Sequence, residues 1–230
     1  MDTVLAEFVE HAASIATSGR WDAVNETVRE WAVRPKIKED MWYGELFGQL
    51  CFRVFYEYSA LKEAYVAPPP KDDLALLSWR ARNLLELSVW ANFCAKDRNK
   101  ARQFFEDLGK DANNLLKAFQ TWGQATNQAP DWFQRGADAR DGLAIAALQR
   151  GVASIDGQFT KVAEAAVEVG ISQHFNLMNK LLSKFAHPTA MLILRNSEAR
   201  QMQKEMAFAN GCLCFVGAFT ALETISKSGV

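Results

Sequence analysis

The hydropathy pattern of this 230-residue chain is helical along almost its whole length. Apolar residues recur at spacings of three and four, and no segment shows the alternation that a half-buried strand requires. We therefore predict an all-α protein, a multi-helix bundle of about seven to eight helices. No internal repeat is visible. The chain length fits a single helical domain, 1–230, in which 1–38 could form an appended helical hairpin.

Capping and breaking residues predict where these helices begin and end. The predicted helical stretches are 2–17, 21–33, 39–65, 72–96, 100–124, 131–170, 172–186 and 197–226. The run Pro68-Pro69-Pro70 stops the third helix, and we interpret it as a rigid turn within one domain. Asp72 and Asp73 suit the N-cap and first turn of the next helix, and Ser172 suits the N-cap of the seventh stretch. Four glycines predict that stretch 131–170 is a broken or paired helix.

Charge and hydropathy narrow the cellular setting. The chain has 26 basic and 27 acidic residues and a net charge of −1, so it has no general attraction for nucleic acid or an anionic membrane. Its first residues carry acid early and lack the basic start of a secretory signal. The longest apolar run, 211–221, is shorter than the roughly 20 residues that span a bilayer, and it predicts a buried helix. We expect a cytoplasmic protein with no membrane partner.

The cysteines do not form a metal or redox motif. They are Cys51, Cys94, Cys212 and Cys214. The last two are two positions apart, so on a helix they point about 200° away from each other and cannot share a metal. We interpret all four as small apolar core residues in a reducing compartment, and we predict no metal and no cofactor.

Arg82 and Glu86 are the first candidate site residues. They lie four positions apart on a helix that is apolar nearly all round, so they share a face and should lie between other helices. Arg80 faces elsewhere. An exposed pair of this kind would contribute only about 0.3–0.5 kcal/mol. The other interpretations are a buried pair that sets helix register, and a binding or catalytic site that uses the guanidinium group.

Ser183 and His187 are the second candidate pair. Both follow the polar side of stretch 172–186, and Pro188 ends that helix directly after His187. At a helix C-terminus an imidazolium is favoured by the helix dipole. His187 could serve as a general acid or base with Ser183 one turn earlier, or it could be a structural helix-end histidine.

We hypothesise that Arg82, Glu86, Ser183 and His187 meet in one buried polar cluster. Sequence spacing cannot show this contact. No H-x-x-x-H or E-x-x-H pattern is present, so a helical-bundle metal site is not predicted.

The two segments also carry a resemblance. Arg82-Asn83-Leu84-Leu85-Glu86 followed by Ser183-x-x-x-His187-Pro188 resembles uncharacterised bacterial all-helical families, distantly similar to the HEPN superfamily. The resemblance covers residues 72–195 and implies a bacterial toxin–antitoxin or phage-defence setting. Catalytic HEPN proteins cleave RNA with an Arg followed four to six residues later by a His. This chain has no Arg at that distance before any of its histidines.

The third predicted helix, 39–65, is rich in aromatic residues on more than one face. Such breadth favours a core on one side and an interface, such as a homodimer contact, on the other, although a wide core stripe gives the same pattern. We therefore expect a homo-oligomer.

These observations lead to one preferred function and one alternative. The preferred function is a non-catalytic binding or interaction module whose Arg82, Glu86, Ser183 and His187 contact a protein partner or a small anionic ligand, in a bacterial defence setting by resemblance. The alternative is a HEPN-like, metal-independent ribonuclease or toxin component. In that alternative, RNA is the substrate, and Arg82, Glu86 and His187 are the catalytic candidates.

Overall fold

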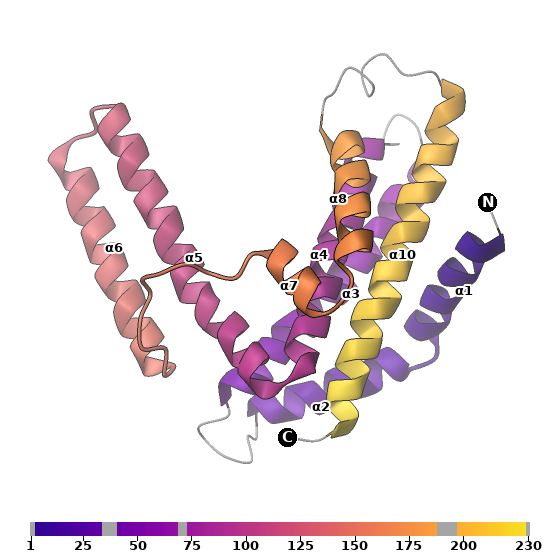
Figure 1. Cartoon of the computed structure of the whole chain (residues 1–230), viewed down its shortest axis with the longest axis horizontal. Coiled ribbons are helices and arrows are strands. Elements are labelled where there is room, and N and C mark those ends of the chain that lie inside the picture. Colours follow the sequence, from indigo (N-terminus) through magenta and orange to yellow (C-terminus); the bar gives the residue numbers. More distant parts are fainter. Residues whose placement is uncertain (1–2, 34–40, 69–72, 188–196, 229–230) are drawn as a thin grey trace. The chain divides into compact units, whose positions relative to one another are not determined.

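The computed structural model describes residues 3–33, 41–68, 73–187 and 197–228. Within these ranges it contains helices and no strand, which confirms the all-α class (Figure 1). The helices are α1 (Thr3–Thr17), α2 (Arg20–Val33), α3 (Met41–Val66), α4 (Leu74–Lys96), α5 (Arg98–Ala125), α6 (Pro130–Gln149), α7 (Val162–Glu168), α8 (Ser172–Ala186) and α10 (Ser197–Ser228). In the described residues this makes nine helices rather than seven to eight, because the predicted stretch 131–170 is two helices, α6 and α7, joined by a loop.

The helix ends follow local signals in most places. Asp73 is the N-cap of α4, where its Oδ1 accepts a hydrogen bond of 2.8 Å from the backbone N–H of Ala75. Asp72 and the proline run beyond Pro68 lie outside the described residues. Ser172 is the first residue of α8 and not its N-cap, since Ile171 occupies the capping position without a side-chain bond. The preceding turn at Gly170, with a φ of +77°, starts this helix one residue earlier than predicted.

Contacts within the chain define two compact units. Unit 1 comprises residues 1–98 and 162–230, and unit 2 comprises residues 99–161. Neither boundary coincides with the proline run near Pro68.

Helix α10 is the central helix of unit 1 and packs against α1, α3 and α4. Tyr58 of α3 stacks on Phe215 of α10 with ring centroids 3.9 Å apart. Two turns later Tyr65 stacks on Phe208 at 4.0 Å. The residue number rises along α3 as it falls along α10, so the two helices run antiparallel. Aromatic stacks of this kind add to the free energy gained from the buried area.

Gly211 allows α10 to approach its neighbours closely. A Cβ atom at this position would lie 2.5 Å from Leu61 Cδ2 on α3 and 3.4 Å from Ala81 Cβ on α4. Any larger residue would force these helices apart or displace Leu61.

In the part of the chain that the structure describes, one helical segment, Arg200–Ser228, is long and apolar enough to cross a membrane, with a mean hydropathy of 1.4. In this structure 61% of its most apolar window is buried inside the protein. Cys212, Phe215 and Leu222 are fully buried, which agrees with the buried helix predicted for 211–221. The core helix of a bundle meets the same length and hydropathy criteria.

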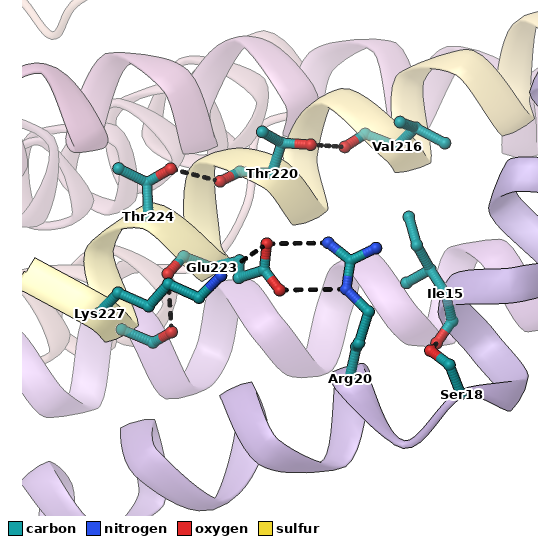
Figure 2. A network of polar contacts seen from close by, with 9 residues as sticks. Ile15, Ser18, Arg20, Val216, Thr220, Glu223, Thr224 and Lys227 are labelled. Carbon is teal, nitrogen blue, oxygen red and sulfur yellow. Dashed lines mark hydrogen bonds and ion pairs between the residues drawn. The ribbon is translucent and has the colours of Figure 1, made fainter.

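Helices α1 and α2 form a hairpin that is held to α10 by an ion pair (Figure 2). Arg20 donates from Nε and Nη2 to the two carboxylate oxygens of Glu223, at 3.1 and 2.8 Å. Lys227 lies 3.3 Å from the same carboxylate. The hydrogen bond from Arg20 is the main reason that the pKa of Glu223 is lowered below its ordinary value. Nearby, Trp21 is buried and stacks on Phe55 at 4.8 Å.

Unit 2 is a hairpin of α5 and α6 with the loop after α6 folded back onto α5. The buried side chain of Asn113 donates to the carbonyl oxygen of Ile155 at 3.0 Å and to Asp156 at 3.1 Å. Arg140 of α6 donates to the other oxygen of Asp156 at 2.9 Å. Asp156 therefore links both helices to the loop, and the hydrogen bond from Arg140 is the main cause of the lowered pKa of its carboxyl group.

The four cysteines are free and buried. Burial raises the pKa of the Cys51, Cys212 and Cys214 thiols to about 12. The pKa of Cys94 is also raised by burial. Protonated thiols in a dry core behave as small apolar side chains, as the sequence predicts.

The Arg20–Glu223 ion pair predicts a pH-dependent stability. A carboxyl group with a lowered folded-state pKa stabilises the fold above its unfolded pKa, about 4.3 for glutamate, and this contribution is lost as pH falls through the lower folded value. We expect Glu223→Gln to lower the melting temperature by about 2–4 °C at pH 7. The difference from the wild type should shrink below about pH 4.

Thermal denaturation followed by circular dichroism at pH 7 and pH 3.5 measures this effect. Glu10→Gln on the exposed side of α1 is the matched control and should leave the melting temperature unchanged at both values. A Glu223→Gln difference that stayed constant between pH 7 and pH 3.5 would contradict the assignment.

Candidate functional site

Arg82 and Glu86 form the i,i+4 ion pair that their spacing predicts. Arg82 Nη2 lies 3.2 Å from Glu86 Oε1. Their side chains are 31% and 34% exposed, however, so the prediction of a buried position is wrong. The reason is that Arg82 lies at the border of the buried side of α4, which carries the fully buried Leu77, Ala81 and Leu85.

Arg82 also joins α4 to α8, which Figure 1 shows side by side. Its Nε donates to Asn179 Oδ1 at 2.9 Å. Farther along α4, Lys96 Nζ donates to the carbonyl oxygen of Glu168, just before α8, at 2.9 Å. A later position on α4 thus meets an earlier position on the α7–α8 segment, and the two helices run antiparallel.

This antiparallel arrangement separates the residues that the sequence groups together. Starting from Arg82, Glu86 lies one helical turn along α4, toward the end of the α4–α8 contact that is near α7. His187 lies two turns beyond Asn179 in the opposite direction. At about 1.5 Å per residue, Glu86 and His187 are roughly 18 Å apart along the helix axes.

His187 is the C-cap of α8, as predicted, and its side chain is exposed. Its backbone N–H donates to the Ser183 carbonyl oxygen at 3.2 Å, which ties the two residues through the main chain. Pro188 lies outside the described residues. The predicted buried Arg/Glu/His cluster is therefore wrong in two respects: Arg82 and Glu86 are partly exposed, and His187 lies at the exposed end of a helix two turns away.

The more deeply buried ion pair of this region joins Arg80 to Glu57 of α3. Arg80 Nη1 lies 3.0 Å from Glu57 Oε2, and the two side chains are 23% and 6% exposed. Burial alone would lower the pKa of Arg80, but its hydrogen bond to Glu57 and the charge of that carboxylate outweigh burial and raise the pKa. From the sequence, Arg80 was expected on a different face of the helix from Arg82. The sequence did not predict that this face contacts the carboxylate of Glu57.

Arg80 contacts an exposed aromatic side chain of α3. Its guanidinium carbon lies 5.7 Å from the centroid of the Tyr56 ring, within cation–π range. Tyr56 in turn stacks on Phe52 at 6.0 Å. Phe52, Tyr56 and Trp79 are 60%, 45% and 54% exposed. We call Phe52, Tyr56, Trp79 and Arg80 the α3–α4 aromatic face.

Two residues of this region, Glu57 and Asn179, were not predicted from the sequence. Glu57 lies in a helix that is rich in aromatic residues, and a buried glutamate is rarely without a partner. Its position in the sequence therefore indicates that a cationic side chain should lie nearby. Asn179 gave no comparable signal, because amide side chains are common on exposed helix faces. Among the described residues, no group of three or more His, Cys, Asp or Glu side chains is placed to hold a metal ion.

Comparison with protein-family models, with curated proteins and with solved structures finds no match to this chain.

We expect truncation of Arg80 and of Arg82 to lower the free energy of unfolding by different amounts. Arg80→Ala leaves the buried carboxylate of Glu57 without its guanidinium partner, and we expect a loss of about 2–3 kcal/mol of unfolding free energy. Arg82→Ala removes a half-exposed ion pair and one hydrogen bond, and we expect a loss of about 1 kcal/mol.

Urea denaturation followed by tryptophan fluorescence measures both values. Arg80→Lys keeps the charge next to Glu57 and should recover part of the loss. If Arg82→Ala were as costly as Arg80→Ala, the assignment of the more important pair to Arg80 and Glu57 would be incorrect.

Proposed function

We propose that this chain is a non-catalytic interaction module that binds a protein partner through the α3–α4 aromatic face. The observation that carries the proposal is the exposure of three large aromatic side chains on α3 and α4, one of which, Tyr56, contacts an arginine that Glu57 holds in place. Trp, Tyr and Arg are the residue types that contribute most to protein–protein interfaces. Because Glu57 fixes Arg80, a partner would not have to order that side chain on binding.

The charges of this region support a protein partner over a small anion. Arg80 faces Glu57 and Arg82 faces Glu86, so both guanidinium groups are already next to carboxylates. An anionic ligand would have to compete with these carboxylates. A protein surface gains affinity instead by covering apolar area, which Phe52, Tyr56 and Trp79 offer.

The Arg82–Asn179 contact has a supporting role in this proposal. It ties α4, the helix that carries Trp79, to α8. The resemblance to HEPN proteins would place the module in a bacterial toxin–antitoxin or phage-defence system. The alternative is a metal-independent ribonuclease that uses Arg82 and His187. The axial separation of about 12 Å between these residues, eight helical positions, favours the non-catalytic proposal.

An RNA cleavage assay separates the two functions. We expect purified protein to leave single-stranded and structured RNA intact in the presence of a metal chelator. Cleavage that disappears in His187→Ala, while Lys180→Ala retains it, would overturn the proposal in favour of the ribonuclease. Both positions are exposed on α8, so neither change should disturb the fold.

Substitution of the aromatic face tests partner binding. We expect affinity capture from a bacterial lysate to retain a defined protein with the wild type, and Trp79→Ala and Tyr56→Ala to reduce its recovery at least about tenfold, since an interface anchor contributes about 2 kcal/mol or more. Leu177→Ala is the matched control, because Leu177 is 63% exposed on α8, outside this face. Equal recovery with Trp79→Ala and Leu177→Ala would exclude the aromatic face as the contact surface.

A further inference from the structure

A hollow of about 250 Å³ lies between the two helices of unit 2. Helix α5 contributes Phe119 and Gln120 to its lining, and α6 contributes Trp132, Arg135 and Ala139. Pockets for drug-sized molecules enclose about 300–1,000 Å³, so this hollow suits a smaller organic molecule.

Two glycines, one on each helix, shape the hollow. Gly123 of α5 lies against Trp132, because a Cβ atom at this glycine would lie 2.6 Å from Trp132 Nε1. Gly136 of α6 lies against Gln120, because a Cβ atom there would lie 3.5 Å from Gln120 Nε2. Each of these large side chains therefore packs onto the bare backbone of the opposite helix. The hollow lies beside these two contacts, and Trp132, Gln120 and Gly136 form part of its wall.

The lining of the hollow is mainly apolar and includes two aromatic rings. Phe119 is 50% exposed, so much of its ring is open to a ligand. Trp132 is half-buried and lines the hollow from α6. Aromatic rings prefer stacked or edge-to-face contacts with other rings, and these contacts add to the free energy gained from the buried area. An aromatic ligand is therefore favoured over an aliphatic ligand of similar size.

Arg135 is the charged residue among the described residues that line the hollow. It is exposed, and its Nε donates to the backbone oxygen of Asp131 at 3.3 Å. Within the described ranges, no carboxylate pairs with its guanidinium group. Arg80 and Arg82 of unit 1, in contrast, each face a carboxylate. The Nη groups of Arg135 therefore remain available to an anion, and a guanidinium group forms strong paired hydrogen bonds with a carboxylate.

We propose that this hollow binds a small aromatic carboxylate. The ring of the ligand lies against Phe119 and Trp132, and its carboxylate accepts hydrogen bonds from Arg135. Charge complementarity selects the anion, since a cationic ligand would be repelled by the guanidinium group and a neutral ligand would leave it to water. The aromatic lining selects the ring.

This site is separate from the surface that we propose for partner binding. It belongs to unit 2 and shares no residue with the α3–α4 aromatic face of unit 1. It also differs from the Arg82–Glu86 pair, where a small anion would have to compete with a carboxylate. The chain can hold the ligand and a protein partner at the same time, so failure of either proposal leaves the other standing.

Isothermal titration calorimetry of the full-length chain with 2-naphthoate, a two-ring aromatic carboxylate, tests the site. We expect saturable binding with a dissociation constant of about 1 mM or tighter, as for a small ligand of ordinary efficiency. The neutral analogue 2-naphthamide should bind at least about tenfold more weakly, because it lacks the charge that Arg135 recognises. Octanoate, which carries the same charge on an aliphatic chain, should also bind more weakly. Absence of saturable 2-naphthoate binding, or equal binding of either comparison compound, would overturn the proposal.

Removal of the guanidinium group tests the role of Arg135. We expect Arg135→Gln to weaken 2-naphthoate binding at least about tenfold and to leave 2-naphthamide binding unchanged. Arg29→Gln is the matched control, because Arg29 is exposed on α2 of unit 1, and it should change neither. A preference for 2-naphthoate over 2-naphthamide that persisted in Arg135→Gln would show that another residue binds the carboxylate.

Filling the hollow tests its location. Ala139→Trp places a large side chain in the hollow and should abolish binding of both 2-naphthoate and 2-naphthamide. Ala137→Trp is the matched control, because Ala137 is exposed on the same helix outside the lining, and it should bind both compounds as the wild type does. Circular dichroism checks that both variants keep their helical content. Undiminished binding by a folded Ala139→Trp variant would exclude the hollow as the site.

Discussion

The packing of α10 against α3 and α4 is the interaction on which unit 1 depends. Gly211 lets α10 approach α3 until a Cβ would clash with Leu61, and on this interface Tyr58 stacks on Phe215 and Tyr65 on Phe208. The hydrophobic effect supplies most of the free energy of such a core. With α10 in this position, α4 is buried on one side only, and the charged residues of α4 are left at the borders with α3 and α8.

Those borders explain the different environments of Arg80 and Arg82. The two residues are two positions apart, so they point about 200° away from each other on α4. Arg80 reaches α3 and a carboxylate that is almost fully buried, whereas Arg82 reaches α8 and remains half-exposed. The pair that spacing makes obvious, Arg82 with Glu86, is the more exposed of the two. The outer side of α4 between them carries Trp79 and supports the proposed role in partner binding.

The α3–α4 aromatic face of unit 1 has exposed aromatic side chains beside a guanidinium group that Glu57 holds in place, which suits a separate partner.

The amino-acid sequence by itself determined the all-α class, most helix ends and the Arg82–Glu86 pair. All of these depend on residues within four positions of one another, as with the Asp73 cap of α4, so periodicity and capping chemistry are enough to predict them. Only the tertiary structure decided which helices meet. The partners of Arg80, Arg82 and Arg20 are 23, 97 and 203 residues away along the chain, and no local pattern encodes these distances. The antiparallel course of α4 and α8 is likewise set by packing, and for this reason His187 ends far from the residues with which the sequence had grouped it.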